Sequence, residues 1–194
     1  MKKSIVSLLF MVLLSGVFAQ EEGKVRGGLD LGFCIPKGGG GLCLDINLGY
    51  NIQDNMTVGI RLGSAIMGRT DPFGETASAS GNLSIAGTYN YYFSTGTSPF
   101  APFVGGGLGV YGVASMASGN NSVSVEAGNR LGGLLTAGAE LGKFRFALEY
   151  NLIPSSAVKI SGNETGIVLE NDKIKNSYMA ITIGFYIGGG KWKK

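Results

Sequence analysis

A strict alternation of apolar and polar residues runs through most of this chain, and it constrains the fold more than any other feature. Successive side chains of a β-strand point to opposite faces of the sheet, so a period of two residues indicates strands with two different faces. The predicted strands cover residues 24–36, 42–51, 55–66, 81–93, 100–113, 130–141, 144–153 and 176–187. These eight segments predict an all-β chain.

The connections between these segments alternate in length. Short connections follow the second, fourth and sixth strands, near Gln53, at 94–99 and at 142–143. Long connections, rich in Gly, Ser, Asn and Thr, follow the third, fifth and seventh strands, at 67–80, 114–129 and 154–175. The first connection, at 37–40, is a short exception. Strands joined in this way are expected to pair as antiparallel neighbours in chain order.

The two faces of the predicted strands differ sharply in charge. One face carries apolar and aromatic side chains and no charged residue, as at Leu29, Leu31 and Phe33. The other face carries four basic and four acidic residues, with many glycines. These residues are Arg26, Asp30, Asp45, Arg61, Arg130, Glu140, Arg145 and Glu149. Such a balanced set suits a closed interior, because each buried charge needs a partner.

An apolar outer face and a charged inner face are the inverse of a soluble sandwich or barrel. In hydrocarbon every backbone polar group must be bonded within the protein, so a membrane-spanning sheet must close. We therefore predict an eight-stranded antiparallel up-and-down transmembrane β-barrel with the charged residues in its lumen. A soluble lipocalin-type barrel is the alternative, and the assignment of the two faces disfavours it.

Composition restricts the chemistry. The chain has no histidine, so catalysis by a histidine base, histidine-activated nucleophiles and histidine metal ligation are excluded. Charged residues make up 15 % of the chain and no basic run occurs inside it, which argues against nucleic acid as a partner. We predict no enzymatic activity, no cofactor and no metal site.

The first residues resemble an export signal. Lys2 and Lys3 precede an apolar run over 5–14, and small or slim residues lead to a cleavage site before Gln20. The run is too short for a membrane-spanning helix. The predicted organisation is a cleaved signal peptide, 1–19, and a barrel domain, 20–194. Both ends of the mature chain fall on the side of the short turns, which predicts periplasmic termini.

The turns also predict which residues face each other. A first hairpin centred between Gly38 and Gly39 places Cys34 opposite Cys43 in the lumen. Export into an oxidising compartment then predicts a disulfide between them. Two free interior thiols and a redox-active pair are the alternatives.

Turns elsewhere predict ion pairs in the lumen. The Gly142–Lys143 turn places Glu140 opposite Arg145, and Thr136 opposite Glu149. A turn centred on Gln53 places Asp45 opposite Arg61. We interpret these pairs as salt bridges that fill the lumen, because eight strands leave an interior only wide enough for side chains.

The stretches 102–109 and 137–142 and the last strand, which ends Phe185-Tyr186-Ile187, resemble the small eight-stranded outer-membrane barrels of Gram-negative bacteria. These are the OmpA-like and OmpX-like proteins of the porin family. The resemblance implies a barrel in the outer membrane of the cell envelope, surrounded by lipid. Members of that family usually end on an aromatic residue, whereas this chain continues past Ile187.

The predicted function is a structural or surface-interaction role for a monomeric barrel with a packed polar lumen. Residues 157–169 alternate around Gly162-Asn163, so the last two strands are expected to extend beyond the membrane. The resemblance to OmpX implies that such long outer loops capture surface partners by strand addition. A narrow porin-like pore for small solutes is the alternative function.

Overall fold

The computed structural model describes residues 21–70, 77–93, 99–119, 122–157, 173–174 and 176–189. The predicted signal peptide, 1–19, lies outside the described residues, and so does nearly all of the predicted extension over 157–169. Within the described ranges, no helix is long and apolar enough to span a membrane.

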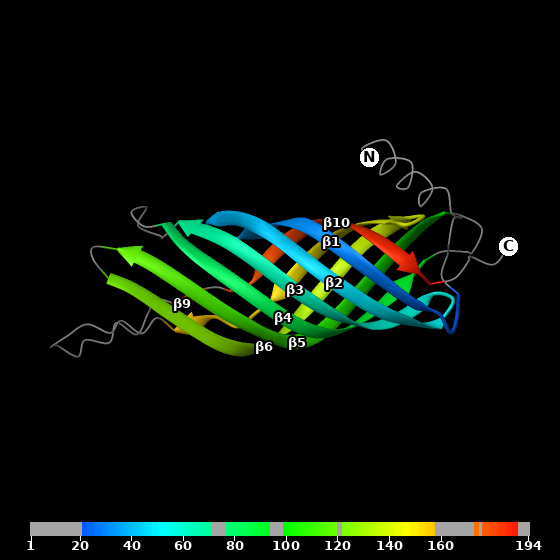
Figure 1. Cartoon of the computed structure of the whole chain (residues 1–194), viewed down its shortest axis with the longest axis horizontal. Coiled ribbons are helices and arrows are strands. Elements are labelled where there is room, and N and C mark those ends of the chain that lie inside the picture. Colours follow the sequence, from blue (N-terminus) through cyan, green and yellow to red (C-terminus); the bar gives the residue numbers. More distant parts are fainter. Residues whose placement is uncertain are drawn as a thin grey trace, which may run out of the picture.

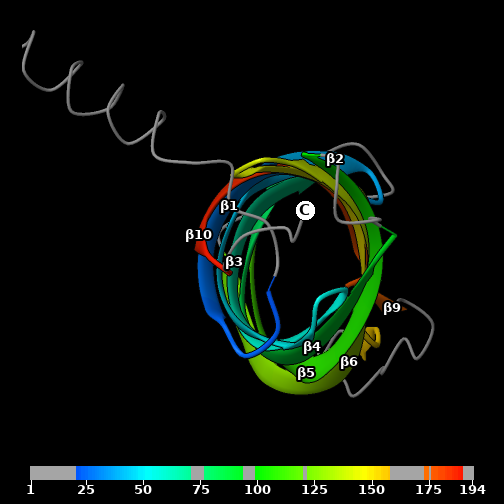
Figure 2. The same cartoon turned by 90° about the vertical axis from the view of Figure 1, so that its right-hand side faces the viewer.

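Eight strands close into one antiparallel barrel, as the alternation predicts (Figures 1 and 2). Around the barrel the order is β1-β10-β7-β6-β5-β4-β3-β2, so strands that follow each other in the chain are neighbours and β10 closes the sheet on β1. The strands are β1 (Val25–Pro36), β2 (Gly39–Gln53), β3 (Met56–Thr70), β4 (Ala77–Tyr92), β5 (Phe100–Gly119), β6 (Ser122–Leu141), β7 (Phe144–Leu152) and β10 (Tyr178–Gly188). The short strands β8 (Ser156–Ala157) and β9 (Lys173–Ile174) form a separate pair.

The two ends of the barrel differ. Tight turns join β2 to β3 and β6 to β7 at one end, which we call the short-turn end. The first and last strands also meet there, where the Glu21 amide donates a hydrogen bond of 2.6 Å to the Gly189 carbonyl. At the opposite end, the long-loop end, β5 and β6 project farthest from the barrel (Figure 1).

Five strands are longer than predicted, and one of them is β2, which covers Gly39–Gln53 instead of 42–51. β5 and β6 continue to Gly119 and from Ser122, so most of the predicted loop over 114–129 is paired strand. β3 and β4 extend in the same way, to Thr70 and from Ala77. The apolar alternation is weaker in these segments, but the backbone of each still pairs with the strand that shares its hairpin. Pairing therefore continues after the side-chain signal has ended.

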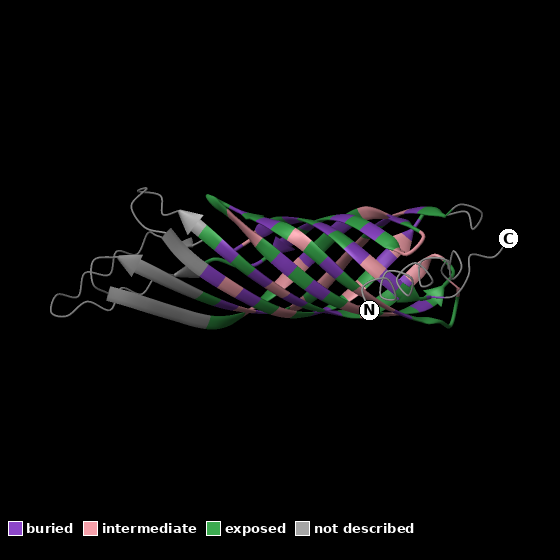
Figure 3. Ribbon diagram, turned by 45° about the horizontal axis from the view of Figure 1, so that its top comes forward, coloured by how far each residue is buried: buried purple, intermediate pink, exposed green. Residues whose placement is uncertain are grey.

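Burial alternates along the strands as the two predicted faces require (Figure 3). Along β7 every second residue is exposed and every other one is buried, from Phe144 to Leu152. The exposed positions in the middle of the barrel are large and apolar, such as Leu31 on β1 and Ile183 on β10. The buried positions point into the lumen. The apolar face is thus on the outside.

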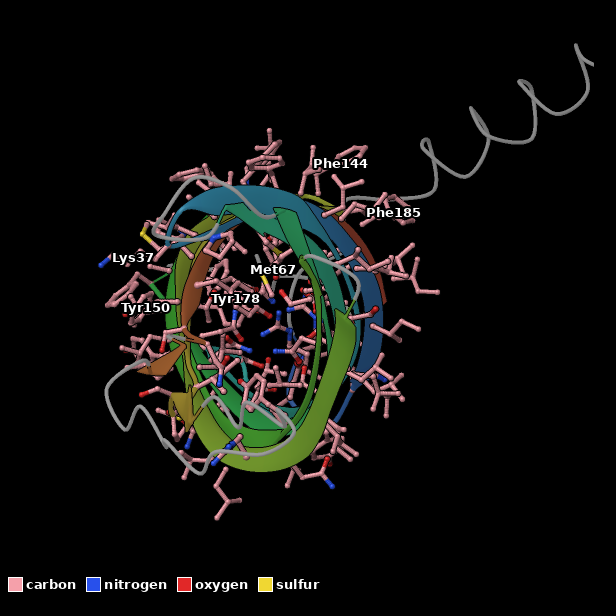
Figure 4. The ribbon with its side chains drawn as sticks, turned by 90° about the vertical axis from the view of Figure 1, so that its left-hand side faces the viewer. Lys37, Met67, Phe144, Tyr150, Tyr178 and Phe185 are labelled. Atoms are coloured by element: carbon pink, nitrogen blue, oxygen red, sulfur yellow. The ribbon has the colours of Figure 1, made fainter. Side chains whose placement is uncertain are left out.

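Aromatic side chains gather on the outer surface at the short-turn end. Tyr91 and Phe93 make an edge-to-face pair with ring centroids 5.1 Å apart. Phe144 and Phe185 make a second pair at 5.7 Å, and both rings point away from the lumen (Figure 4). Such a girdle is typical of the level at which a barrel meets lipid headgroups.

A charge in the middle of the outer face should destabilise the barrel far more than a charge near its rim. Leu31→Arg places a guanidinium at mid-barrel, where the side chain is 55 % exposed. We expect it to reduce the free energy of folding into lipid vesicles by about 2–4 kcal/mol. The matched change Val25→Arg, at the first residue of β1, should cost about 0–1 kcal/mol. Urea titrations of both variants in vesicles measure the difference, and equal losses would contradict a lipid-facing belt.

Candidate functional site

The lumen is filled by polar and charged side chains from every strand of the barrel. Seven of the charged residues predicted for the inner face are buried there, namely Arg26, Asp30, Asp45, Arg61, Glu140, Arg145 and Glu149. Arg130, on the long-loop half of β6, is half-buried. The structure therefore gathers most of the predicted charges into one column along the barrel axis.

Glycines make room for the aromatic rings that share this column. Gly28 on β1 lies against the ring of Tyr186, and a Cβ added there would overlap the ring. Gly132 on β6 takes the same place beside Tyr111, where a Cβ would come within 2.8 Å of the ring. A narrow barrel can hold large inward side chains only where neighbouring positions are bare backbone.

The cluster nearest the short-turn end joins three strands that are not neighbours. The Arg26 guanidinium on β1 forms a salt bridge of 2.8 Å with the Glu140 carboxylate on β6. Arg26 also donates a hydrogen bond of 3.0 Å to the Tyr92 hydroxyl on β4, and that hydroxyl donates one of 2.9 Å to Glu140. The three side chains therefore form a closed triangle across the lumen.

A second cluster centres on Tyr186 of β10. Its hydroxyl donates a 2.7 Å hydrogen bond to Asp30, and the same carboxylate oxygen accepts a 2.7 Å bond from the Asn47 amide. Arg145 donates a 3.2 Å bond to the Tyr186 hydroxyl, while its guanidinium carbon lies 4.0 Å from the centroid of the Phe103 ring. This stacking adds a cation–π attraction to the hydrogen bonds.

A third cluster lies farther along the barrel axis. One terminal nitrogen of Arg61 on β3 contacts two carboxylates, Asp45 on β2 at 2.7 Å and Glu149 on β7 at 2.8 Å. Beside it, the Tyr111 hydroxyl donates a hydrogen bond of 3.3 Å to the Asn151 side-chain oxygen. One arginine thus compensates two buried acids from opposite parts of the wall.

Little empty space remains between the first two clusters. A cavity of about 20 Å³ lies there, lined by Arg26, Asn90, Tyr92 and Arg145 among others. This is room for a single water molecule, which needs polar partners to be retained. The buried side-chain oxygen of Asn90 is without a hydrogen-bond partner within the described protein and fits that role.

The register predicted from the β6–β7 turn is confirmed. Glu140 lies opposite Arg145 and Thr136 lies opposite Glu149. The strongest contact of Glu140 is nevertheless with Arg26 at 2.8 Å, whereas its distance to Arg145 is 4.0 Å. The position of the turn correctly predicts which residue of β7 lies opposite Glu140. It does not predict the salt-bridge partner of Glu140, which comes from β1.

The register predicted for Asp45 is wrong. Asp45 lies opposite Gly63, while Arg61 lies opposite Asn47, because the turn occupies residues 54–55 instead of being centred on Gln53. The predicted ion pair forms all the same, since the long arginine side chain reaches the diagonal neighbour.

The register predicted for the cysteines is also wrong. Cys34 lies opposite Gly41, and Cys43 lies opposite Gly32. The two-residue connection ends at Gly38, which adopts φ +79°, so the hairpin is centred one residue earlier than predicted. The two cysteines are therefore diagonal neighbours rather than a directly opposed pair, and the disulfide between them stays a prediction. The geometric reason for the predicted disulfide is therefore wrong, and both cysteines are buried free thiols in the structure.

Sequence reasoning missed the tyrosine that completes the first cluster. Tyr92 is fully enclosed, with 1 % of its surface exposed. It follows the outward-facing Tyr91 and shares the polar face of β4 with Asn90. Tyr92 could have been assigned to the lumen from the sequence, because it lies two positions after Asn90 in the alternation. The outward-facing aromatic residues on either side of it obscured this assignment.

Comparison with known proteins identifies the fold. Neither protein-family models nor curated protein sequences match this chain. Among solved structures it is similar to Neisserial surface protein A, with 15 % identity over 86 % of this chain and 97 % of that one, at a TM-score of 0.55. It is also similar to the outer membrane protein OprG of Pseudomonas aeruginosa, with 16 % identity over 87 % and 98 % of the two chains, at a TM-score of 0.54.

Removing the arginine that serves two acids should destabilise the barrel strongly. Arg61→Met leaves Asp45 and Glu149 buried without their shared cation, so we expect a loss of about 3–5 kcal/mol in the free energy of unfolding. The triple variant Arg61→Met, Asp45→Asn, Glu149→Gln removes all three charges and should recover most of this loss. Urea unfolding in detergent, followed by the mobility of unheated samples on gels, measures both. A loss below about 1 kcal/mol for the single variant would contradict the role of Arg61.

Proposed function

We propose that this protein is an integral barrel of the outer membrane of a Gram-negative bacterium, with a structural and surface-interaction role and no enzymatic activity. The observation that carries the proposal is the inversion of the barrel. Its outer surface is apolar with an aromatic girdle, whereas its charges are buried in the lumen. Only a lipid environment makes such an exterior favourable.

The proposal includes an orientation and a processing step. Residues 1–19 act as a cleaved signal peptide, and the mature chain, 20–194, forms the barrel as a monomer. The short-turn end faces the periplasm, together with both termini of the mature chain. Tight turns on the periplasmic side and longer segments outside are the common arrangement of such barrels. The side-by-side start of β1 and end of β10 supports placing both termini on one side.

The lumen clusters brace the wall rather than line a channel. Arg26 connects β1 to β6, and Arg61 connects β2 and β3 to β7, so ion pairs cross the interior at two levels. Each of these charges is engaged by another side chain, which supports a structural role over a catalytic one. A narrow pore for small solutes remains the alternative function.

Planar-bilayer recordings separate a braced lumen from a pore. We expect the folded protein to give no steady conductance, because side chains cross the lumen at both levels. Insertion must be verified in the same membranes by protease protection, so that silence does not reflect failed insertion. Steady, reproducible conductance of inserted protein would overturn the braced lumen and support the pore.

The surface for interaction that we propose is the outer part of β6. This strand pairs with β5 along its whole length, from Ser122 to Leu141, but with β7 only from Gly133 onward. Among the described residues, no strand pairs with the other edge of 122–132. An open strand edge offers backbone donors and acceptors that an extended segment of a partner can bind.

The turn between β6 and β7 shows which residues of β6 face that edge. Leu141 and Phe144 flank a two-residue turn, so they exchange both backbone hydrogen bonds. Bonding then alternates along β6, whose pairing with β5 and β7 has no register shift. Odd-numbered residues such as Val125 therefore direct their amides toward the β7 side, and even-numbered residues such as Ser124 direct theirs toward β5.

Val125→Pro should abolish strand capture without weakening the barrel. Proline removes an amide from the open edge but leaves the hydrogen bonds to β5 in place. We expect proteins that co-purify with the wild type after cross-linking on intact cells to be lost from this variant, while heat resistance is unchanged. Ser124→Pro is the matched control, because it removes a bond to β5 and should lower stability. Equal capture by wild type and Val125→Pro would contradict an interaction through this edge.

A further inference from the structure

Three sulfur-bearing side chains meet in the lumen beyond the third charged cluster. Cys34 on β1, Cys43 on β2 and Met67 on β3 have 0 %, 5 % and 2 % of their surface exposed and belong to one buried cluster. Met67 points into the barrel interior, as does Tyr178 of β10 (Figure 4). None of these sulfur atoms takes part in the lumen salt bridges.

The strand register brings the three side chains together. Gly41 lies between Cys34 on one side and Met67 on the other. A side chain at Gly41 would strike the Ile66 carbonyl and come within 2.7 Å of the Met67 Cα, so the position is bare. No side chain therefore separates Cys34 from Met67 at the position of Gly41.

Cys43 completes a triangle. It follows Gly41 by two residues on the same face of β2, and it is the diagonal neighbour of Cys34 in the same buried cluster. Small residues flank the pair on both sides, with Ala180 opposite Cys34 and Ala65 opposite Cys43. The directly opposed positions are therefore small, while Tyr178 on β10 belongs to the same buried cluster.

This arrangement has the chemistry of a soft-metal site. Thiolate and thioether ligands together select Cu(I) among the biological metals, and three sulfur ligands suit its low coordination number. The geometry points to a Cu(I) site formed by Cys34, Cys43 and Met67. On binding, each thiol releases its proton to water and no electron is transferred.

The site lies near one end of the barrel. Cys34 is two residues from the end of β1, at the long-loop end of the barrel. In the proposed orientation this end faces outward. The sequence, which has no histidine, predicted no metal site, and Met67 was not among its candidate residues. Within the described chain, no group of three His, Cys, Asp or Glu residues could hold a metal, so the thioether is the required third ligand.

Titration of the folded mature barrel in detergent with Cu(I), against a competing chelator and without oxygen, tests the site. We expect one equivalent to be retained, with sulfur-only coordination in X-ray absorption spectra. Cys34→Ser and Cys43→Ser should abolish retention. Met67→Leu conserves volume and should weaken binding at least tenfold. The matched control Met179→Leu changes an outward-facing methionine and should bind like the wild type.

Three results would overturn the proposal. The first is a wild-type barrel that retains no Cu(I) when its thiols are counted as free. The second is a disulfide that forms in cells and persists in the folded protein, since it would occupy both thiols. The third is equal affinity of Met67→Leu and Met179→Leu, which would show that the thioether is not a ligand. This pair of variants decides the outcome even where the serine variants fail to fold.

Discussion

Closure of the sheet on itself is the constraint on which the rest of this structure depends. A strand edge in hydrocarbon would leave a row of amides and carbonyls without partners, so the pairing of β10 with β1 is as necessary as any hairpin. Closure with eight strands also sets the width of the interior. The lumen admits side chains but little else, and every inward residue must fit against residues from the opposite wall.

That narrow interior explains how this chain tolerates so many buried charges. Each arginine in the lumen clusters meets a carboxylate or a tyrosine within hydrogen-bonding distance, and two of them also lie over aromatic rings. Removing one member would leave its partner buried without compensation, which costs several kcal/mol. Glycines on nearby strands leave room for the tyrosine rings among these charges. Gly28 lies against the ring of Tyr186, and Gly132 lies against the ring of Tyr111. The glycine-rich composition and the charged lumen therefore have one cause.

The registers predicted from the sequence are correct where the centre of the turn can be located to the residue. The Gly142–Lys143 turn has one geometry, so the positions of Glu140 and Arg145 were predictable to the residue. The glycine run after Lys37 allows several positions for the centre of the hairpin. The actual centre lies one residue earlier than predicted, so the two cysteines are not directly opposite each other. The turn between β2 and β3 lies at 54–55, beyond the predicted centre at Gln53, and this displaced Asp45 relative to Arg61. The strand ends beyond 113 and before 130 carry only a weak apolar alternation, as over 122–126, so backbone pairing is needed to reveal their full length.

The sequence by itself determined the two faces of every strand, because alternation depends only on the extended backbone. It therefore also determined that the barrel is closed, apolar outside and charged inside. Tertiary structure alone decided which charges from non-neighbouring strands meet. Arg26 and Glu140 lie 114 residues apart on strands that are not neighbours, and only closure at this diameter brings them to 2.8 Å. The triangle of Cys34, Cys43 and Met67 has the same origin, since it depends on the register of two hairpins and on the curvature that turns three side chains toward one point.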